Sequence, residues 1–308
     1  GGDVPNLPPI YEHPSVVCGQ RHCCSWLLDN RDAYCWGAND KKQSGSSNSF
    51  ATTAQNISLP GEIVQIALGD LHSCALVQEV QDQQVNLRGY CWGDNTNGKI
   101  GINSASPVAY ERPSNDQPVR SAAFTGGEER LANVFAGRHH TCASMAPTED
   151  INNQNAGILC WGKNSDSSAG QPQDVTQLLQ ATETPFSGPI IRMERERIPA
   201  PPEPHLFAAN EFTSCFVTDY GERSVSCFGS NQAHLIRPDL AVDSIIPADQ
   251  TRSVPTVSNV NSLSLGETIA CVTSQGRTTV ECWGTGIAGH AGGGGGGGGD
   301  IVTYPLDQ

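Results

Sequence analysis

The stretch Gly89-Tyr90-Cys91-Trp92-Gly93-Asp94-Asn95 decides the fold, because recognisable copies of it recur four more times along the chain. The copies are Cys35-Trp36-Gly37, Cys160-Trp161-Gly162, Cys227-Phe228-Gly229 and Cys282-Trp283-Gly284. Another cysteine stands 11 to 18 residues ahead of each copy, at Cys24, Cys74, Cys142, Cys215 and Cys271. The chain is therefore built from one two-cysteine module that is used five times.

Self-similarity of this kind is the sequence signature of a repeat architecture. Short apolar runs such as residues 63–69 and 132–137 end in a turn residue, here Gly69 and Gly137. Runs of this length bounded by Gly, Asn and Asp are typical of strands joined by hairpins. A module of three or four short strands cannot bury both of its faces alone, so neighbouring modules must stack, as the blades of a propeller do. The sequence predicts an all-β fold, a β-propeller of about five blades.

One module also carries a family resemblance. Gly69-x-x-His72-x-Cys74-Ala75-Leu76, followed by the Cys91-Trp92-Gly93 copy, resembles a repeat of the regulator of chromosome condensation family. It is most similar to the extracellular, cysteine-bearing form found in secreted bacterial proteins and in crinkly-type receptor-like kinase ectodomains of plants. The resemblance spans roughly residues 15 to 290 and implies a β-propeller.

The fourth and fifth modules depart from the family pattern. Asn210, Thr213 and Phe228 replace the motif Gly, His and Trp in the fourth, and Ile269 replaces the His in the fifth. Family propellers usually have six or seven repeats, whereas five can be counted here. Five blades, or an incomplete ring completed by sequence outside this chain, both remain open.

The repeats run nearly end to end, which favours a single domain over residues 1–290. We expect modules at about 11–60, 61–128, 129–204, 205–258 and 259–290, followed by a Gly-rich segment and a C-terminal closing strand in residues 291–308. Polar segments of variable length, residues 78–87, 106–129, 149–156 and 170–204, are expected to be loops that carry the function.

Twelve cysteines indicate the compartment. Ten form five within-module pairs at hairpin distance: Cys24–Cys35, Cys74–Cys91, Cys142–Cys160, Cys215–Cys227 and Cys271–Cys282. Cys18 and Cys23 remain, and either pair with each other or bond a neighbouring chain. Because structural disulfides are rare in the cytosol, the chain is predicted to be extracellular. A zinc site is the rival interpretation, but C-x2-C pairs are absent.

The repeated aromatic residues are interpreted as blade core rather than as a binding site. They are Trp36, Trp92, Trp161, Phe228 and Trp283. His22, His72 and His140 recur at one module position, which favours a repeated structural hydrogen bond at a turn over metal binding. Asp40, Asp94 and Asp166 follow the Cys-Trp-Gly copies and are expected to cap turns. No catalytic, cofactor-binding or metal-ligating set is predicted, and the chain is expected not to be an enzyme.

Charge narrows the class of partner. The formal net charge of -14 disfavours nucleic acid, whose phosphates require a basic face. The basic residues of 192–197 alternate with acids, which indicates a solvated loop. Eight successive glycines at 292–299 lack the Lys and Ser/Thr of a phosphate-binding loop and indicate a linker.

The beginning and the hydropathy of the chain give two further expectations. No signal peptide is visible, so we expect it to have been removed or left out. No stretch reaches the roughly 18 apolar residues of a membrane span, so no direct membrane insertion is expected. Asn56-Ile57-Ser58 is the N-glycosylation sequon, and Asn56 is predicted to carry a glycan.

These observations predict a non-enzymatic extracellular propeller with a structural or adhesive role, in contact with extracellular protein or glycan. A homo-oligomer or filament, as in a surface fibre or coat, fits the polar, aromatic-poor loops. The alternative is a ligand-binding ectodomain or a secreted inhibitor of the same fold.

Overall fold

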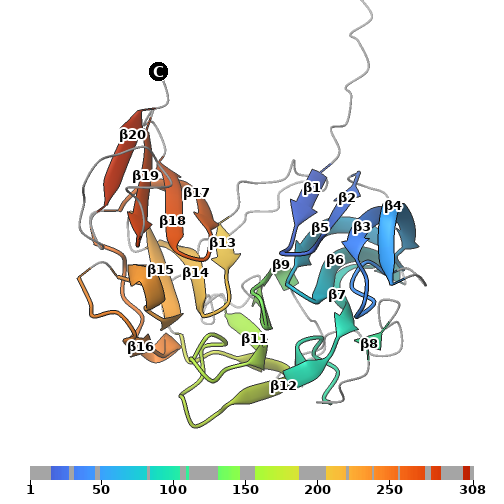
Figure 1. Ribbon diagram of the computed structural model, residues 1–308, viewed down its shortest axis with the longest axis horizontal. Coiled ribbons are helices and arrows are strands. Elements are labelled where there is room, and N and C mark those ends of the chain that lie inside the picture. Colours follow the sequence, from blue (N-terminus) through green and yellow to red (C-terminus); the bar gives the residue numbers. More distant parts are fainter. Residues whose placement is uncertain are drawn as a thin grey trace, which may run out of the picture.

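The computed structural model of the chain is all-β in the main, as predicted (Figure 1). It describes residues 15–27, 31–45, 49–81, 84–104, 109–110, 131–145, 157–186, 206–219, 222–237, 239–255, 257–274, 279–285 and 301–305. Residues 192–197, 292–299, 149–156, nearly all of 106–129 and the end of 170–204 lie outside this part, and so do the predictions made for them.

The described strands form five four-stranded antiparallel sheets, which we number blades 1 to 5. Blade 1 contains β1 (Ser15–Cys18), β2 (His22–Trp26), β3 (Asp32–Ala38) and β4 (Phe50–Ser58). Blade 2 contains β5 (Glu62–Leu68), β6 (His72–Gln81), β7 (Gln84–Asp94) and β8 (Ala109–Tyr110). Blade 3 contains β9 (Leu131–Ala136), β10 (His140–Met145), β11 (Ile158–Lys163) and β12 (Gln177–Glu183).

Blade 4 contains β13 (Phe207–Ala209), β14 (Thr213–Asp219), β15 (Arg223–Ser230) and β16 (Ile245–Ile246). Blade 5 contains β17 (Val260–Leu265), β18 (Ile269–Ser274), β19 (Thr279–Gly284) and β20 (Val302–Pro305). Three short 3₁₀ helices, η1 (Thr96–Gly98), η2 (Gln232–His234) and η3 (Ala248–Gln250), lie in loops. None of the helices in the described residues has the length and apolar character of a membrane span.

The blades follow one another around a common axis, from blade 1 in blue to blade 5 in red, with the first strand of each blade innermost and the fourth at the periphery (Figure 1). The apolar core lies between the blades. One cluster joins blades 1 and 2 through residues such as Trp26, Ile66 and Trp92, and a larger one runs from blade 2 to blade 5. Stacking of blades thus buries the sheet faces that a single module leaves open.

Each module bends at the glycine of its Cys-Trp-Gly copy. Gly93 has φ +101°, and a Cβ atom there would lie 2.6 Å from the carbonyl oxygen of Leu71. Only glycine tolerates both the left-handed backbone and this approach. The equivalent Gly37 and Gly162 lie next to register shifts in their strands. The repeated glycine therefore turns the third strand of each blade into the following loop.

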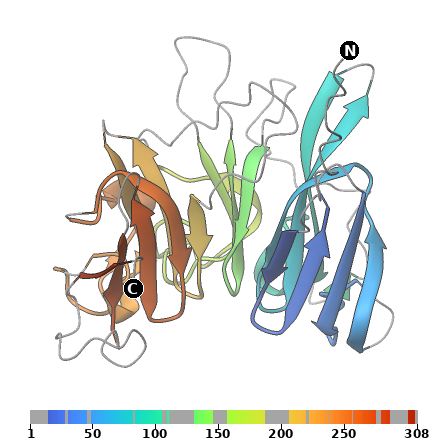
Figure 2. The same cartoon turned by 90° about the horizontal axis from the view of Figure 1, so that it is seen from above.

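The sequence interpretation of residues 78–87 as a loop is wrong. Gln78 to Gln81 pair in register with Gln84 to Leu87, so β6 and β7 continue as a two-stranded ribbon beyond the last pairing of β5, Glu62 with Gln78. Figure 2 shows this ribbon extending past the rest of blade 2. Arg88 lies 3.3 Å from Glu79, and the Tyr90 hydroxyl donates to Glu79, so side-chain contacts also join the two strands. The polar composition of this segment had suggested an irregular loop.

The C-terminal strand belongs to the same sheet as the fifth module. β20 pairs antiparallel with β19, from Thr279 opposite Pro305 to Cys282 opposite Val302. A strand beyond the glycine run therefore supplies the outer edge of blade 5.

Candidate functional site: the blade junctions and the two faces of the disc

Six disulfides hold the described strands, and five of them join cysteines that the sequence spacing pairs. Cys24–Cys35, Cys74–Cys91, Cys142–Cys160, Cys215–Cys227 and Cys271–Cys282 link the second and third strands of each blade, where the two cysteines face each other in register. Cys18–Cys23 links β1 and β2 of blade 1. No cysteine is free.

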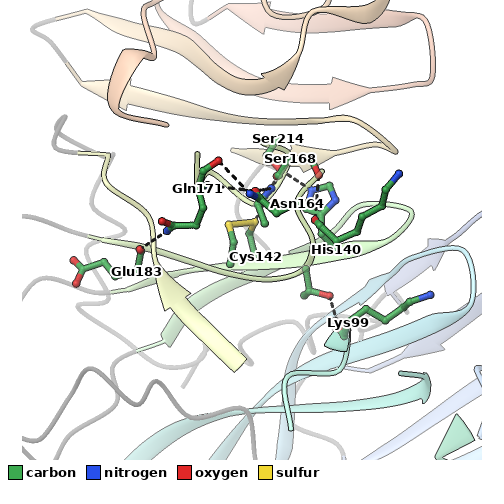
Figure 3. The surroundings of a disulfide bond; sticks show 12 residues. Lys99, His140, Cys142, Asn164, Ser168, Gln171, Glu183 and Ser214 are labelled. Carbon is green, nitrogen blue, oxygen red and sulfur yellow. Dashed lines mark hydrogen bonds between the residues drawn. A yellow bond between two sulfur atoms is a disulfide. The ribbon is translucent and has the colours of Figure 1, made fainter. Parts of the chain in front are cut away.

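A histidine of one blade contacts a hydroxyl of the next blade at three junctions. The distance from His Nε2 to the hydroxyl oxygen is 2.8 Å for His22 and Ser73, 2.7 Å for His72 and Thr141, and 2.8 Å for His140 and Ser214. Figure 3 shows His140 and Ser214 meeting beside Cys142. The hydrogen bond recurs as the sequence suggests, but it joins two blades instead of closing a turn within one.

Each hydroxyl in turn donates to a backbone carbonyl of the previous blade. Ser73 donates to Gln43 at 2.7 Å, Thr141 to Lys99 at 3.2 Å and Ser214 to Ser168 at 2.9 Å. Two of the repeated tryptophans use the same carbonyl position, since Trp92 Nε1 donates to Gln43 at 2.9 Å and Trp283 Nε1 donates to Leu235 at 2.8 Å. We call each set of a histidine, the hydroxyl it contacts and the carbonyl that accepts from this hydroxyl a junction relay.

The acceptor carbonyl is positioned by an asparagine that sequence analysis did not single out. Asn39, Asn95, Asn164 and Asn231 are all buried, and the side-chain oxygen of each accepts from the backbone N–H five residues later, at Ser44, Ile100, Ala169 and Ile236. The backbone carbonyl four residues after each asparagine accepts a hydrogen bond from a hydroxyl or tryptophan side chain of the next blade. The signal was present in the sequence, as an Asn two residues after each of the first four Cys-Trp-Gly or Cys-Phe-Gly copies.

The glycine of the Gly-x-x-His motif makes room for the histidine ring. A Cβ atom on Gly69 would lie 2.2 Å from Cε1 of His72 and 2.7 Å from the carbonyl oxygen of Gly137 in the next blade. Gly137 is crowded in the same way, by His140 and by the carbonyl of Asn210. The two motif residues therefore depend on each other, and the turns of consecutive blades touch near the axis.

The relay is missing between blades 4 and 5, and both of its side chains are missing together. Thr213 stands in place of the histidine and donates to Ser230 of its own blade at 2.8 Å, while Ala270 stands in place of the hydroxyl residue. Asn210 replaces the motif glycine, which is compatible with a small Thr213. Its amide donates to the carbonyl of Gly266 at 2.9 Å and so still links the two blades.

Burial keeps the relay histidines neutral. It lowers the pKa of His22 to about 4 and that of His140 to about 3. Burial, followed by the charge of Lys99, also holds the pKa of His72 well below 6.5. Among the described residues, Nδ1 of each of these three rings has no hydrogen-bond partner. The rings therefore act as neutral hydrogen-bonding groups.

The hydroxyl–histidine distances are those of a nucleophile and its base, yet the chemistry of a nucleophile does not fit. Ser73, Thr141 and Ser214 are fully buried, each hydroxyl proton is directed to a carbonyl, and no described group orients Nδ1 of the histidine. The described residues also contain no cluster of His, Cys, Asp or Glu that could hold a metal ion. The relays are structural.

Asp94, predicted to cap a turn, forms a buried ion pair with Lys99 at 2.5 Å and accepts a hydrogen bond from Thr96 at 2.9 Å. Burial alone raises the pKa of Asp94, but the hydrogen bond and charge of Lys99 outweigh it and hold the pKa below 3.8. Asp40 accepts from Gln43, and Asp166 accepts from Ser165, both within their own loops.

A small charged cluster lies where the motif turns meet. Arg138 is 2.5 Å from Glu211 and 3.5 Å from Asp70, so it bridges blades 2, 3 and 4. Gln20 donates to Glu267 at 3.2 Å, which is a contact between blades 1 and 5. These polar contacts hold one end of the disc together.

The antiparallel topology separates two faces of the disc. The Gly-x-x-His turns and the asparagine loops lie on one, which we call the turn face, as the bond from Ala38 N to Arg21 O shows. The strand ends Gln81, Leu131, Met145 and Glu183 lie on the opposite face, which we call the insertion face. The segments 106–129 and 170–204 begin on the turn face, next to the asparagine loops that contain Ser104 and Gly170. The β6–β7 ribbon rises from the insertion face, with Val80 69% exposed (Figure 2).

The repeated aromatic residues are buried in four blades and partly exposed in the first. Trp92, Trp161, Phe228 and Trp283 are at most 1% exposed, whereas Trp36 is half-buried. Asn56 is exposed on β4.

In blade 4 a surface pocket of about 520 Å³ is lined by Arg237, Arg252 and Asp249 among others, and Arg237 is already paired with Asp239.

Known proteins resemble the chain in fold. The chain is 31% identical to the ultraviolet-B receptor UVR8 of Arabidopsis thaliana over 163 residues, which is 52% of the chain and 32% of UVR8. Human WBSCR16 superposes with a TM-score of 0.64 at 17% identity, covering 90% of the chain and 63% of that structure. Prp20p of Saccharomyces cerevisiae, the yeast RCC1, gives 0.60 at 16% identity, covering 94% and 61%. No model of a protein family matches the chain.

The chain spans about a third of UVR8 and less than two thirds of the two solved structures. At these identities the structural likeness concerns the fold alone. Five antiparallel sheets around an axis, the Gly-x-x-His and Cys-Trp-Gly repeats, and the superposition on yeast RCC1 agree with one another. The chain is a disulfide-bearing, RCC1-like β-propeller.

Proposed function

We propose that the chain is a non-enzymatic extracellular propeller that binds another extracellular protein or a glycan. The observation that carries the proposal is the pairing of all twelve cysteines in six disulfides. Structural disulfides in this number belong to secreted or cell-surface proteins, because cytosolic thiols are kept reduced. The extracellular location is thus argued from chemistry, not from the relatives.

The insertion face is the binding face in this proposal. The turn face is occupied by relays, asparagine loops and ion pairs that the fold needs, so it has little freedom to vary. Strand ends that border the segments differing between modules lie on the insertion face, on a scaffold cross-linked by disulfides, and binding residues concentrate on loops held in this way. The ribbon of β6 and β7 offers an ordered part of this face, with the exposed Val80 near its tip.

One relative supports protein recognition as a use of this fold. The study of Prp20p concerns its binding to Gsp1p and histones. Those partners are not transferred here, because the chain spans less than two thirds of Prp20p and about a third of UVR8. The net charge of -14 separately opposes direct binding to nucleic acid. An adhesive or structural role, including self-assembly into a fibre or coat, is the form of the proposal that best fits a polar face.

Two exposed valines on opposite faces give a matched test. The secreted chain, immobilised, is incubated with the extracellular fraction of its source, and retained proteins or glycans are identified. We expect Val80→Arg to abolish retention of the partner and Val242→Arg, in an asparagine loop on the turn face and 45% exposed, to leave it unchanged. Retention that is insensitive to Val80→Arg and lost with Val242→Arg would place the binding site on the turn face and contradict the proposal.

The location is tested separately by counting thiols. Chain isolated from its native source under alkylating conditions should show no free cysteine and should be found outside the cell. Intracellular chain with reactive thiols would refute the proposal, whatever it binds.

A further inference from the structure

One face of blade 1 is exposed although its counterparts in the other blades are buried. We call it the open flank: Val16, Ser25, Tyr34 and Trp36, with the Cys18–Cys23 disulfide. The register shows which residues of blade 2 are equivalent. Ile66 pairs with Ala75 and Ala75 with Tyr90, as Val16 pairs with Ser25 and Ser25 with Tyr34.

The equivalent residues differ sharply in exposure. Ile66 is 3% exposed and Val16 59%, while Tyr90 is 4% exposed and Tyr34 46%. Ile66 and Tyr90 are buried in the core cluster that blade 1 forms against blade 2. Among the described residues, no preceding blade covers the open flank in this way. It therefore presents apolar and aromatic side chains of the kind that the other junctions bury.

The predicted sequon lies on this same flank. Asn56 of β4 pairs directly with Tyr34 of β3, and both side chains are exposed. Residues directly opposite each other in neighbouring strands project to the same face. Val16, Ser25, Tyr34 and Asn56 thus form one row across β1, β2, β3 and β4, three strand spacings or about 14 Å long.

We propose that an N-linked glycan on Asn56 lies along this row and covers Tyr34 and Val16, in the place that a preceding blade occupies at the other junctions. The inference rests on the extracellular location in the proposed function. Sugar rings present apolar C–H faces that stack on aromatic rings, with hydroxyls left for water. An attached glycan can therefore shield an apolar flank while the surface remains polar.

The position of the sequon favours a sugar over a further blade. At three junctions the incoming face supplies a hydroxyl to the histidine of the preceding blade, through Ser73, Thr141 and Ser214. The equivalent position in blade 1 is Cys23, whose sulfur is bonded to Cys18. A blade could still dock without this contact, as blade 5 does on blade 4, where Ala270 replaces the hydroxyl residue. A sugar attached to Asn56, in contrast, would stand on the flank itself, because Asn56 pairs directly with Tyr34.

The modification requires only a co-substrate of the secretory pathway. The amide Nδ2 of Asn56 forms a bond to the anomeric carbon of the first sugar and loses one proton. The bond from that carbon to the diphosphate of a lipid-linked oligosaccharide breaks, and the lipid diphosphate leaves. Ser58, two residues on and also exposed, completes the acceptor sequence.

The test uses the full chain secreted from eukaryotic cells. Peptide mapping should find Asn56 occupied, and the Ser58→Ala variant should lack the sugar. Nitration of tyrosine is then compared between glycosylated chain, chain treated with peptide N-glycosidase, and Ser58→Ala. We expect Tyr34 to react several-fold faster in the two sugar-free forms. The buried Tyr90 serves as internal control and should remain unreactive in all three, which verifies that the fold is intact.

Each other outcome overturns the inference. An unoccupied Asn56 in secreted chain does so, and so does an occupied Asn56 with unchanged Tyr34 reactivity. Protection of Tyr34 that depends on chain concentration instead of on the sugar would identify a second copy as the occupant. All three can occur with an oxidised, extracellular chain that still binds its partner, so failure here is distinguishable from failure of the proposed function.

Discussion

Nε2 of His140 and Oγ of Ser214 lie 2.8 Å apart although 74 residues separate them in the sequence. The two residues belong to different blades, blade 3 and blade 4. Their contact exists only when blade 3 and blade 4 are docked, and the same holds for His22 with Ser73 and His72 with Thr141. The histidines of the repeat are therefore markers of blade docking.

Stability should fall as the pH drops through the histidine range. The folded pKa of His22 is lowered to about 4 and that of His140 to about 3, both below the value of 6.5 for an exposed histidine. The unfolded chain therefore binds protons first, so the stabilisation is complete above about pH 6.5 and is lost progressively from there down to about 4 and 3. Thermal unfolding followed between pH 7.5 and 4 measures it.

His140→Gln is the control for this pH dependence. The amide cannot titrate but can still reach toward Ser214, so we expect its unfolding midpoint to vary less with pH between 6.5 and 4 than that of the original chain. An identical slope in both proteins would assign the effect to other groups. Asp94 is separable, because its pKa below 3.8 moves its contribution to lower pH.

Trp92→Ala should destabilise the chain by about 3–5 kcal/mol. The side chain is fully buried between blades 1 and 2 and donates to Gln43 at 2.9 Å, so truncation leaves a cavity and removes one of the two hydrogen bonds that the Gln43 carbonyl accepts. Trp36→Ala removes the equivalent but half-buried side chain and should cost clearly less. Urea unfolding of both variants measures the difference. Equal losses would mean that the open flank is covered in the folded chain.

Gly69→Ala should cost about 1–3 kcal/mol through overpacking. The added carbon would lie 2.2 Å from His72 and 2.7 Å from the carbonyl of Gly137. Gly266→Ala changes the same motif position in blade 5, where the nearest atom is 3.4 Å away and belongs to Ile269. That variant should be nearly neutral by the same unfolding measurement. A neutral Gly69→Ala would contradict the account of the Gly-x-x-His motif.

Removing the disulfide Cys142–Cys160, by Cys142→Ala with Cys160→Ala, should lower the free energy of unfolding by about 3 kcal/mol in the chain-entropy model. Its sequence separation is 18, whereas that of Cys18–Cys23 is 5. The shorter loop predicts a smaller loss, about 2 kcal/mol, for Cys18→Ala with Cys23→Ala. Denaturant unfolding ranks the two, and the opposite order would show that cross-linking of the unfolded chain is not the main effect.

The sequence was sufficient for the features that repeat. Two cysteines at hairpin spacing, followed by Trp-Gly, predicted antiparallel strands and the pairs Cys24–Cys35 to Cys271–Cys282 that the structure contains. The need of neighbouring modules to stack, together with the family resemblance, predicted the propeller arrangement. A module position that recurs constrains local geometry strongly, because the same contacts must form in each copy.

The repeat pattern did not predict the contacts between modules. The partners of the Ser73 and Thr141 hydroxyls could not be identified from residue spacing, because each partner lies in the preceding blade. The ribbon around Val80 was missed because polar composition hides strand pairing when both strands project into solvent. Exposure of Tyr34 depends on what precedes blade 1 in space, which no local pattern records.

The missing relay between blades 4 and 5 predicts the order in which the five blades unfold. In a stacked array, stability is the sum of each unit and its contacts with nearest neighbours. Thr213 and Ala270 leave the last junction without the histidine–hydroxyl contact that fastens the first three, although Trp283 still donates to Leu235. Fraying under tension or during hydrogen exchange should therefore start at blade 5 and travel backwards, with blades 1 to 4 opening later as one cooperative block.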